Sequence, residues 1–259
     1  MGRLDNRVAF ITGGGTGIGR AAAALFAREG ARISIADLKP ELGKAAENFV
    51  REAGGEALFV ETDVTDEQSV RASIAATKER YGRIDILYNC AGGSVAEDAP
   101  ITEVDPWVVD HTLALDVKGT LFCCRHGIPE LVEAGGGTVV NMSSTAALRG
   151  GPMHVYSAAK GAIISLTRSL ASSYGQQGVR VNAICPGIVL TDRVRARFGG
   201  LPGDEEGSAD SLAARTAARY PFGVGHANDI AEVALFLASP ESRMVNGSLV
   251  VADGGMAAF

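Results

Sequence analysis

The chain has 259 residues, 46% of them hydrophobic and 21% charged, a balance typical of a folded globular protein that excludes disorder as the main state. Its formal net charge of −6 argues against a nucleic-acid-binding face, because such a face needs clustered lysine and arginine. The longest apolar runs, such as residues 21–27, are far shorter than the roughly 18 residues of a membrane-spanning helix. We therefore expect neither a nucleic-acid nor a membrane partner.

The start of the chain and its cysteines bear on its location. Residues 7–11 already have the pattern of a strand, so we expect no signal peptide. Cys90, Cys123, Cys124 and Cys185 form no Cys-x-x-Cys motif, and no histidine lies at a zinc-finger offset from them. We expect buried thiols in a cytoplasmic protein, and no metal site.

Short β-rich runs alternate with helical patterns along the whole chain. Strands are expected at residues 8–12, 33–36, 58–62, 84–89, 138–142, 179–184 and 249–251. Most of these runs are apolar throughout, which is typical of parallel strands covered on both faces. Helix signals lie between them: Pro40 in a first turn, a capping box over residues 65–68 before a helix that ends near Tyr81 and Gly82, and a helix from Asn228 to about Ser239.

This alternation predicts an α/β fold. We expect one domain over residues 1–259, a Rossmann-type doubly wound parallel sheet of about seven strands with helices on both faces. Residues 193–220 break the rhythm before the last strand, so they form an insertion within the sheet. We expect a substrate lid there, the alternative being a low-complexity linker.

A glycine-rich loop follows the first strand. It reads Thr-Gly-Gly-Gly-Thr-Gly-Ile-Gly from Thr12 to Gly19. Glycines let the backbone turn sharply and approach a diphosphate, and the next helix offers free N–H groups at the positive end of its dipole. A glycine cluster alone is weak evidence, but the strand before it and the helix after it indicate a dinucleotide-binding loop.

Asp37 ends the second strand, 18 residues past Gly19. A carboxylate at that position accepts hydrogen bonds from an adenosine ribose and repels a 2′-phosphate, so NAD(H) is expected over NADP(H). Lys39 is a counterweight, although no arginine is adjacent. The alternative role for Asp37 is a helix N-cap, and both roles are compatible.

Tyr156 and Lys160 are spaced i and i+4, on one face of a helix. A free tyrosine, with a pKa of about 10, is a poor base at neutral pH, and a neighbouring ammonium lowers that pKa. The motif is common by itself, and a surface pair is its usual explanation. Its position shortly after the strand at 138–142 favours a role at the ligand-binding edge of the sheet.

These residues resemble the classical short-chain dehydrogenase/reductase family over essentially the whole chain. The glycine spacing, Asp63 with Val64, the segment 89–92 and the segment 186–191 are similar to the segments with which that family binds its dinucleotide. The resemblance implies these cofactor-binding residues: Gly13, Gly15, Thr16, Gly17, Ile18, Gly19, Asp37, Asp63, Val64, Asn89, Ala91, Gly92, Tyr156, Lys160, Pro186, Gly187, Val189 and Thr191.

The same resemblance assigns catalytic roles. Tyr156 is expected to be the general acid/base, and Lys160 also to hold the nicotinamide ribose. One hydroxyl of Ser143 and Ser144 would orient the substrate oxygen. We choose Ser144, although Ser143 would restore the family's spacing to the tyrosine.

Asp116 departs from the family pattern, which has an asparagine in an Asn-x-x-Gly segment. The asparagine is thought to hold a kinked helix, whose backbone carbonyl orders a water in a proton relay to the lysine. An aspartate keeps the carbonyl, but its ionised side chain only accepts hydrogen bonds. We hypothesise that the relay persists with an altered pH–rate profile, the alternative being a tolerated neutral variation.

Taken together, the sequence predicts an NAD-dependent oxidoreductase that interconverts a small-molecule secondary alcohol and its ketone. One alternative is a 3-ketoacyl-carrier-protein reductase, against which Asp37 and the net charge of −6 speak. Another is a non-catalytic NAD(H)-binding sensor, and the only feature that favours it is Asp116 in place of the family's asparagine. Family analogy suggests a homotetramer.

Three further points concern charged side chains. The histidines are scattered and expected to be structural, except that His154 is near enough to Tyr156 to line the pocket. Arg193, Arg195 and Arg197 stand in or beside the expected lid, where they would meet an anionic substrate group. A solvated helix face explains these arginines equally well.

Overall fold

The computed structural model describes residues 2–198 and 221–258, with side chains up to residue 195 in the first range. Its seven strands form one parallel sheet in the order β3-β2-β1-β4-β5-β6-β7. The strands are β1 (Val8–Thr12), β2 (Arg32–Asp37), β3 (Glu56–Glu61), β4 (Ile86–Asn89), β5 (Gly137–Met142), β6 (Val179–Pro186) and β7 (Leu249–Ala252). The predicted doubly wound single-domain fold is therefore confirmed.

The main helices lie between the strands in the expected alternation. They are α1 (Gly17–Arg28), α2 (Pro40–Glu52), α3 (Glu67–Tyr81), α4 (Pro106–Thr112), α5 (Gly119–Glu133), α6 (His154–Tyr174), α7 (Asp192–Phe198) and α9 (Ala227–Ala238). A π-helical segment, η1 (Leu113–Lys118), joins α4 to α5, and a short 3-10 turn, η2 (Thr145–Ala147), follows β5.

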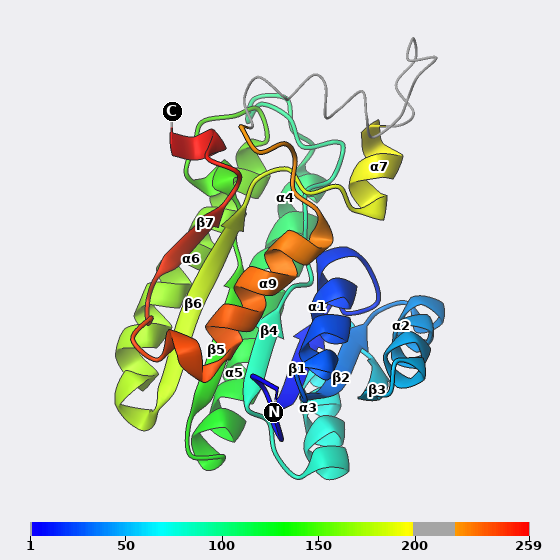
Figure 1. Ribbon diagram of the computed structural model, residues 1–259. Helices are drawn as coiled ribbons and strands as arrows, with labels where there is room; N and C mark the ends of the chain where they lie inside the picture. Colours follow the sequence, from blue (N-terminus) through cyan, green and yellow to red (C-terminus); the bar gives the residue numbers. More distant parts are fainter. Residues whose placement is uncertain (1, 199–220, 259) are drawn as a thin grey trace.

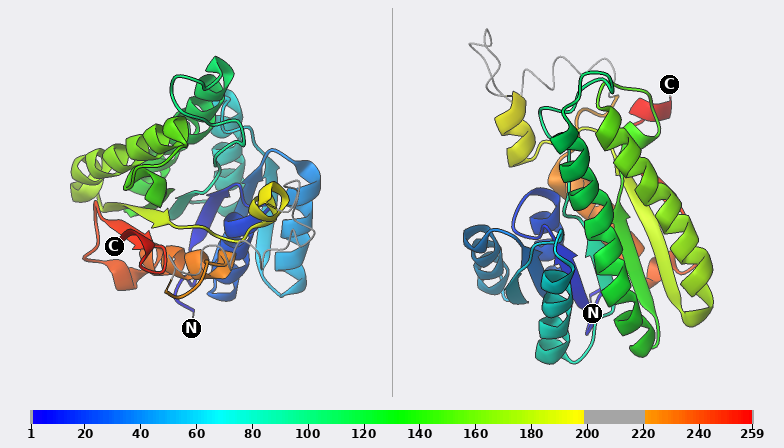
Figure 2. Two further views of the ribbon diagram at one scale, coloured as in Figure 1. Left: turned by 90° about the horizontal axis from the view of Figure 1, so that it is seen from above. Right: turned by 180° about the vertical axis from the view of Figure 1, so that it is seen from behind.

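Both faces of the sheet are covered, as Figures 1 and 2 show, by α1, α2 and α9 on one side and by α3, α5 and α6 on the other. Successive residues of β1 enter different cores. Ala9 and Ile11 pack with the α1 and α9 side, whereas Phe10 packs with the α3 and α5 side. Because each strand is buried on both faces, its sequence is apolar throughout instead of alternating.

Several expected strand ends differ from the observed ones by one or two residues, and three expectations about element ends were wrong for a visible reason. The strand predicted at 84–89 begins at Ile86. Asp85 instead belongs to a polar cluster at the edge of the sheet where the strands start, and its carboxylate accepts from the Val8 N–H. The capping box over residues 65–68 is absent, because Asp66 is the N-cap of α3 and accepts from the Gln68 N–H, while Thr65 bonds to Asp63. Helix α9 begins one residue earlier than predicted, with His226 as its N-cap.

The strand order positions the ligand site. Strand β1 pairs with β2 on one side and with β4 on the other, so the chain connections diverge between β1 and β4. All carboxyl ends meet at one edge, the upper one in Figure 1, where α7 and the C-terminus also lie. In open α/β sheets this topological switch point is where ligands bind.

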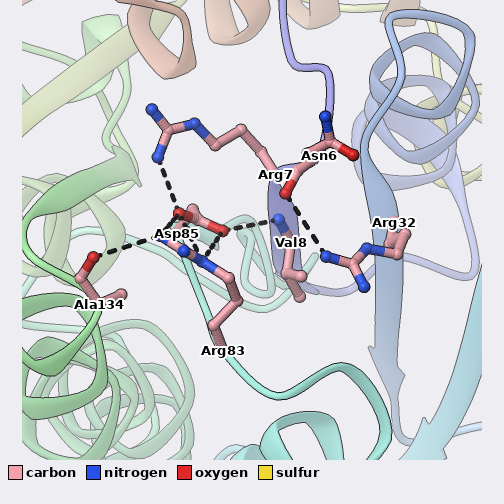
Figure 3. A network of polar contacts seen from close by, with 7 residues as sticks. All are labelled: Asn6, Arg7, Val8, Arg32, Arg83, Asp85 and Ala134. Atoms are coloured by element: carbon pink, nitrogen blue, oxygen red, sulfur yellow. Dashed lines mark hydrogen bonds and ion pairs between the residues drawn. The ribbon is translucent and has the colours of Figure 1, made fainter.

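The opposite edge is held by the buried carboxylate of Asp85, shown in Figure 3. Its Oδ1 pairs with Arg7 Nη1 at 2.8 Å and with Arg83 Nη2 at 2.6 Å. Its Oδ2 accepts from the Val8 N–H at 3.0 Å, and Arg83 also donates to the Ala134 carbonyl. One side chain therefore joins the starts of β1 and β4 to the turn after α5.

Replacing Asp85 by alanine should destabilise the protein without altering the ligand site. The variant leaves the buried Val8 N–H without its acceptor, so we expect the free energy of unfolding to fall by about 2 kcal/mol in urea denaturation. Glu133→Ala, which removes one exposed partner of Lys78, is the matched control and should have a much smaller effect. Equal losses in the two variants would contradict a structural role for the Asp85 cluster.

Candidate active site

A cleft of about 890 Å³ opens at the carboxyl edge of the sheet. Its volume lies in the range of small-molecule and cofactor sites. Of the residues predicted from sequence, the following line it: Gly13, Thr16, Gly17, Ile18, Gly19, Asp37, Asp63, Val64, Ala91, Gly92, Ser144, Tyr156, Lys160, Pro186, Gly187, Val189 and Thr191. Three predicted residues do not line the cleft: Gly15, Asn89 and Asp116. Gly15 bonds to Asp37 and Asp116 pairs with Lys160, both of which line it.

The glycine loop forms one side of this cleft. Gly13 and Gly17 adopt left-handed backbone angles, with φ of 63° and 50°. A Cβ on Gly13 would lie 3.0 Å from the Ala91 Cα, so only a bare backbone fits where the loop passes the end of β4. Thr16, the N-cap of α1, makes no side-chain capping bond, and the first turn of α1 lines the cleft. The loop thus presents a helix N-terminus to a ligand.

Asp37 stands at the end of β2, where the sequence predicts it. Its Oδ2 accepts from the Gly15 N–H at 2.9 Å, and its Oδ1 accepts from the Lys39 N–H at 3.1 Å. Lys39, not Asp37, is the N-cap of α2, so the alternative role as helix cap is not adopted. Gly15 therefore holds the carboxylate instead of facing a ligand itself.

Two side chains tie the strand ends together around the switch point. Thr12 Oγ1 accepts from the N–H groups of Cys90 and Ala91, both at 3.1 Å, which joins β1 to the loop after β4. Asn89 is buried and its Nδ2 donates to Asn141 Oδ1 at 2.8 Å across β4 and β5. Asn89 thus supports the loop from below the cleft.

Helix α6 carries Tyr156 and Lys160 on one face, one turn apart. Lys160 Nζ lies 5.6 Å from the centre of the Tyr156 ring. The ammonium is buried, donates to the Met142 carbonyl at the end of β5 at 3.0 Å, and pairs with Asp116 Oδ1 at 2.7 Å. It is therefore held from two elements while it faces the tyrosine.

Asp116 lies in the π-helical segment η1 and is fully buried. Single π-helical turns are often found at functional sites because they redirect side chains. Its Oδ1 also accepts from the Gly93 N–H at 3.0 Å, whereas its Oδ2 has no hydrogen-bond partner among the described residues. Asp116 thus joins the loop after β4 to Lys160.

This pairing determines the electrostatics of Lys160. Burial by itself lowers the pKa of the Lys160 ammonium, but the charges of Asp116 and Tyr156 raise it, so that the pKa lies above its ordinary value. The lysine therefore stays protonated at neutral pH although it is buried.

The side chains of the two serines after β5 form different hydrogen bonds. Ser143 is buried and its Oγ donates to the Lys160 carbonyl at 2.9 Å. Ser144 is half-buried, and its Oγ accepts from the Ala146 N–H at 3.1 Å, with no described acceptor for its own proton. Both line the cleft, but the hydroxyl with a donor to spare belongs to Ser144.

Asp98 is a site residue that sequence reasoning missed. Its carboxylate accepts from the N–H of Tyr156 at 2.8 Å and from the N–H of Val155 at 3.3 Å, so it caps the first turn of α6. Asp98 and Tyr156 are separated by 58 residues in the sequence, so no local capping pattern can reveal this contact. His154, expected near the pocket, does not line it; its Nδ1 accepts from the Ile101 N–H instead.

The segment after β6 closes the cleft on its remaining side. Thr191 packs against the glycine loop, since a Cβ on Gly17 would lie 3.1 Å from its Cγ2. Arg193, in the first turn of α7, donates to the Gly92 carbonyl at 2.7 Å across the cleft. Of the expected lid, residues 199–220 and the Arg197 side chain lie outside the described residues.

The cysteines carry no disulfide, and Cys123, Cys124 and Cys185 are buried. Burial raises the pKa of Cys90, which lines the cleft, to about 11, and that of Cys124 to about 12. Within residues 2–198 and 221–258, no group of three metal-binding side chains gathers. None of the helices in that part of the chain has the length and apolarity needed to cross a membrane.

Comparison with known proteins identifies the family. A family model described as enoyl-(acyl carrier protein) reductase matches residues 13–257. D-threitol dehydrogenase from Mycolicibacterium smegmatis is 39% identical over 257 residues, which cover 98% of this chain and 94% of the relative.

Solved structures agree. A short-chain type dehydrogenase/reductase from Mycobacterium ulcerans is 32% identical, with a TM-score of 0.90 over 98% of this chain and 91% of that one. Carveol dehydrogenase from Mycobacterium avium, in complex with NAD, is 28% identical, with a TM-score of 0.94 over 100% of both chains. The chain therefore belongs to the classical short-chain dehydrogenase/reductase family of oxidoreductases.

Proposed function

We propose that the protein is an NAD(H)-dependent oxidoreductase that interconverts a secondary alcohol and its ketone, with Tyr156 as general acid/base. The observation that carries the proposal is the Tyr156–Lys160 pair, 5.6 Å from Nζ to ring centre, at the wall of a cleft that the glycine loop also lines. The alcohol dehydrogenases among its relatives, including D-threitol dehydrogenase, support the same chemistry.

The residues of the cleft fit a dinucleotide. The bare backbone of Gly13 and Gly17, in left-handed conformations beside the start of α1, suits a diphosphate group. The Asp37 carboxylate suits a ribose with a free 2′-hydroxyl, and the bonds from Gly15 and Lys39 hold it in place. When bound, nicotinamide would supply or accept the hydride.

The protein's own groups handle the proton. During oxidation the Tyr156 phenolate oxygen takes the proton of the substrate hydroxyl, and during reduction the phenol returns it to the carbonyl oxygen. The Lys160 ammonium is a buried positive charge next to the Tyr156 ring, where it would stabilise the negative charge that develops on the phenol oxygen during proton transfer. The Ser144 hydroxyl, whose proton is uncommitted, donates to the substrate oxygen and orients it.

The other roles expected from the sequence stay predictions. A sensor without chemistry is less favoured, because Ser144, Tyr156 and Lys160 line one cleft. A ketoacyl-carrier-protein reductase is less favoured because Asp37 stands where a 2′-phosphate would bind. The cytoplasmic location, the homotetramer and the lid over residues 193–220 have the status of hypotheses.

Tyr156→Phe tests the proton transfer. The variant lacks the phenol oxygen, so we expect kcat to fall by roughly 10²- to 10⁴-fold in a screen of NAD⁺ reduction over secondary alcohols, sugars and hydroxy acids. NADH binding, followed by fluorescence titration, should change little. Tyr174→Phe, at the far end of α6, is the matched control with unchanged turnover. Wild-type turnover in Tyr156→Phe would rule out the proposed general acid/base.

Asp37→Ser tests the cofactor choice. Loss of a charged acceptor for the ribose should lower kcat/KM for NAD⁺ about tenfold, and loss of its repulsion should raise kcat/KM for NADP⁺. Asp66→Ser, an exposed cap of α3 outside the cleft, should leave both values unchanged. If the NAD⁺/NADP⁺ ratio of Asp37→Ser equals that of the wild type, Asp37 does not select the cofactor.

Asp116→Asn tests the departure from the family pattern. The variant keeps the burial that lowers the pKa of Lys160 and loses a carboxylate that raises it, so that pKa falls. The pH–rate profile of alcohol oxidation should therefore shift to lower pH.

The matched control for this shift is Asp110→Asn, an exposed position on α4. Steady-state rates across the pH range in both variants and the wild type decide the question. An unchanged profile in Asp116→Asn means that the carboxylate has no role distinct from that of an asparagine.

A further inference from the structure

Two arginines that line the cleft have no carboxylate partner among the residues that the structure describes. Arg193 Nη1 donates to the Gly92 carbonyl at 2.7 Å, and Arg149 Nη1, in the loop before α6, donates to the Met256 carbonyl at 3.0 Å. Neither forms an ion pair with a described residue, since all such pairs involve other side chains. A guanidinium has five N–H donors, so most donors of both groups are left for a ligand.

Arg193 lies beside the catalytic groups. The carbonyl that it binds belongs to Gly92, and a Cβ on Gly92 would lie 3.3 Å from Lys160 Nζ. A Cβ on Gly93 would collide with the Arg193 guanidinium itself. The Arg193 guanidinium therefore lies at the end of the cleft lined by Ser144, Tyr156 and Lys160, which we call the reaction end. Arg149 reaches the same cleft from the loop between Ser144 and Tyr156.

The remaining charges of the cleft do not cancel these two. Lys160 is paired with Asp116 behind the wall. Asp192, the neighbour of Arg193, is directed to Arg20 of α1 at 3.9 Å. The other charged lining residues, Asp37, Lys39 and Asp63, follow β2 and β3 at the far side of the sheet. Among the residues that the structure describes, the two arginines of this cleft therefore have no carboxylate partner, in a chain of net charge −6.

We infer that the substrate carries an anionic group, which Arg193 and Arg149 bind while its hydroxyl or carbonyl reaches Ser144 and Tyr156. The inference rests on the proposed function and names its substrate class, a hydroxy acid or the matching keto acid. A carboxylate takes two parallel bonds from a guanidinium and is a stronger acceptor than the Gly92 carbonyl it replaces. Positive charge in a cleft also attracts anionic substrate in a protein that otherwise repels it.

The test compares substrate pairs that differ in charge and by one methyl group: 3-hydroxybutyrate and 4-hydroxypentanoate, each against its methyl ester, with NAD⁺. Wild type should favour the acids by about tenfold or more in kcat/KM, and added salt should reduce that preference. In Arg193→Gln and in Arg149→Gln the ratio of kcat/KM for acid to that for ester should fall towards one, and Arg193→Lys should retain part of the preference. Arg195→Gln, on α7 but outside the cleft lining, is the matched control and should match the wild type.

Two results would overturn the inference. One is equal use of acids and esters by the wild type. The other is a fall in kcat/KM in Arg193→Gln that is equal for acids and esters and is accompanied by weaker NADH binding in the absence of substrate. In that case the arginine binds the diphosphate of the dinucleotide and not the substrate.

A binding measurement keeps this inference separate from the proposed function. If none of these alcohols, nor neutral sugars, reduces NAD⁺, the proposed function fails. Calorimetric titration of 4-oxopentanoate into the protein with NADH then decides the inference. Binding that Arg193→Gln abolishes and Arg195→Gln keeps supports it, and no binding overturns it.

Discussion

The buried ammonium of Lys160 is the interaction on which the rest of the site depends. It meets three parts of the chain that are far apart in sequence: the Met142 carbonyl at the end of β5, the Asp116 carboxylate in η1, and the ring of Tyr156 one turn earlier on α6. A charge removed from water is costly unless it is paired and hydrogen-bonded. The three segments are therefore held together because one buried cation must be compensated, and Tyr156 lies where they meet.

Asp116 carries this constraint into the cofactor side of the cleft. Through the Gly93 N–H it fixes the loop that follows β4, and that loop is also tied to β1 by Thr12. The π-helical segment turns the Asp116 side chain inward, where a carboxylate compensates a positive charge as an asparagine does not. The substitution that sets this chain apart from its family pattern is thus coupled to the protonation of Lys160.

The cleft is divided electrostatically along its length. Asp37 and Asp63 give the side near β2 and β3 a negative character, which is the basis of the proposed preference for NAD(H). Arg149 and Arg193 give the reaction end a positive character. The negative residues follow β2 and β3, whereas the arginines come from the loop before α6 and from α7. The inferred selectivity for an anionic substrate follows from this division.

Local features were predictable from the sequence by itself. Strands buried on both faces are apolar throughout, so all seven were found from their composition, apart from shifts of one or two residues at their ends. The glycine loop, Asp37 at the end of β2, and the spacing of Tyr156 and Lys160 follow from short-range rules of backbone conformation and helix period. Each of these depends on residues that are neighbours in the chain.

Only the tertiary structure decided how distant segments meet. The bonds from the Asp98 carboxylate to the start of α6 join residues 58 positions apart, and the bond from Arg193 to Gly92 spans 101 positions. The choice between Ser143 and Ser144 depends on which hydroxyl faces the Lys160 carbonyl, which the packing of α6 on β5 determines. Such contacts arise from strand order and side-chain direction. The fold class and the spacing of Tyr156 and Lys160 were therefore determined locally by the sequence, whereas the groups that contact this pair from distant segments were decided by packing.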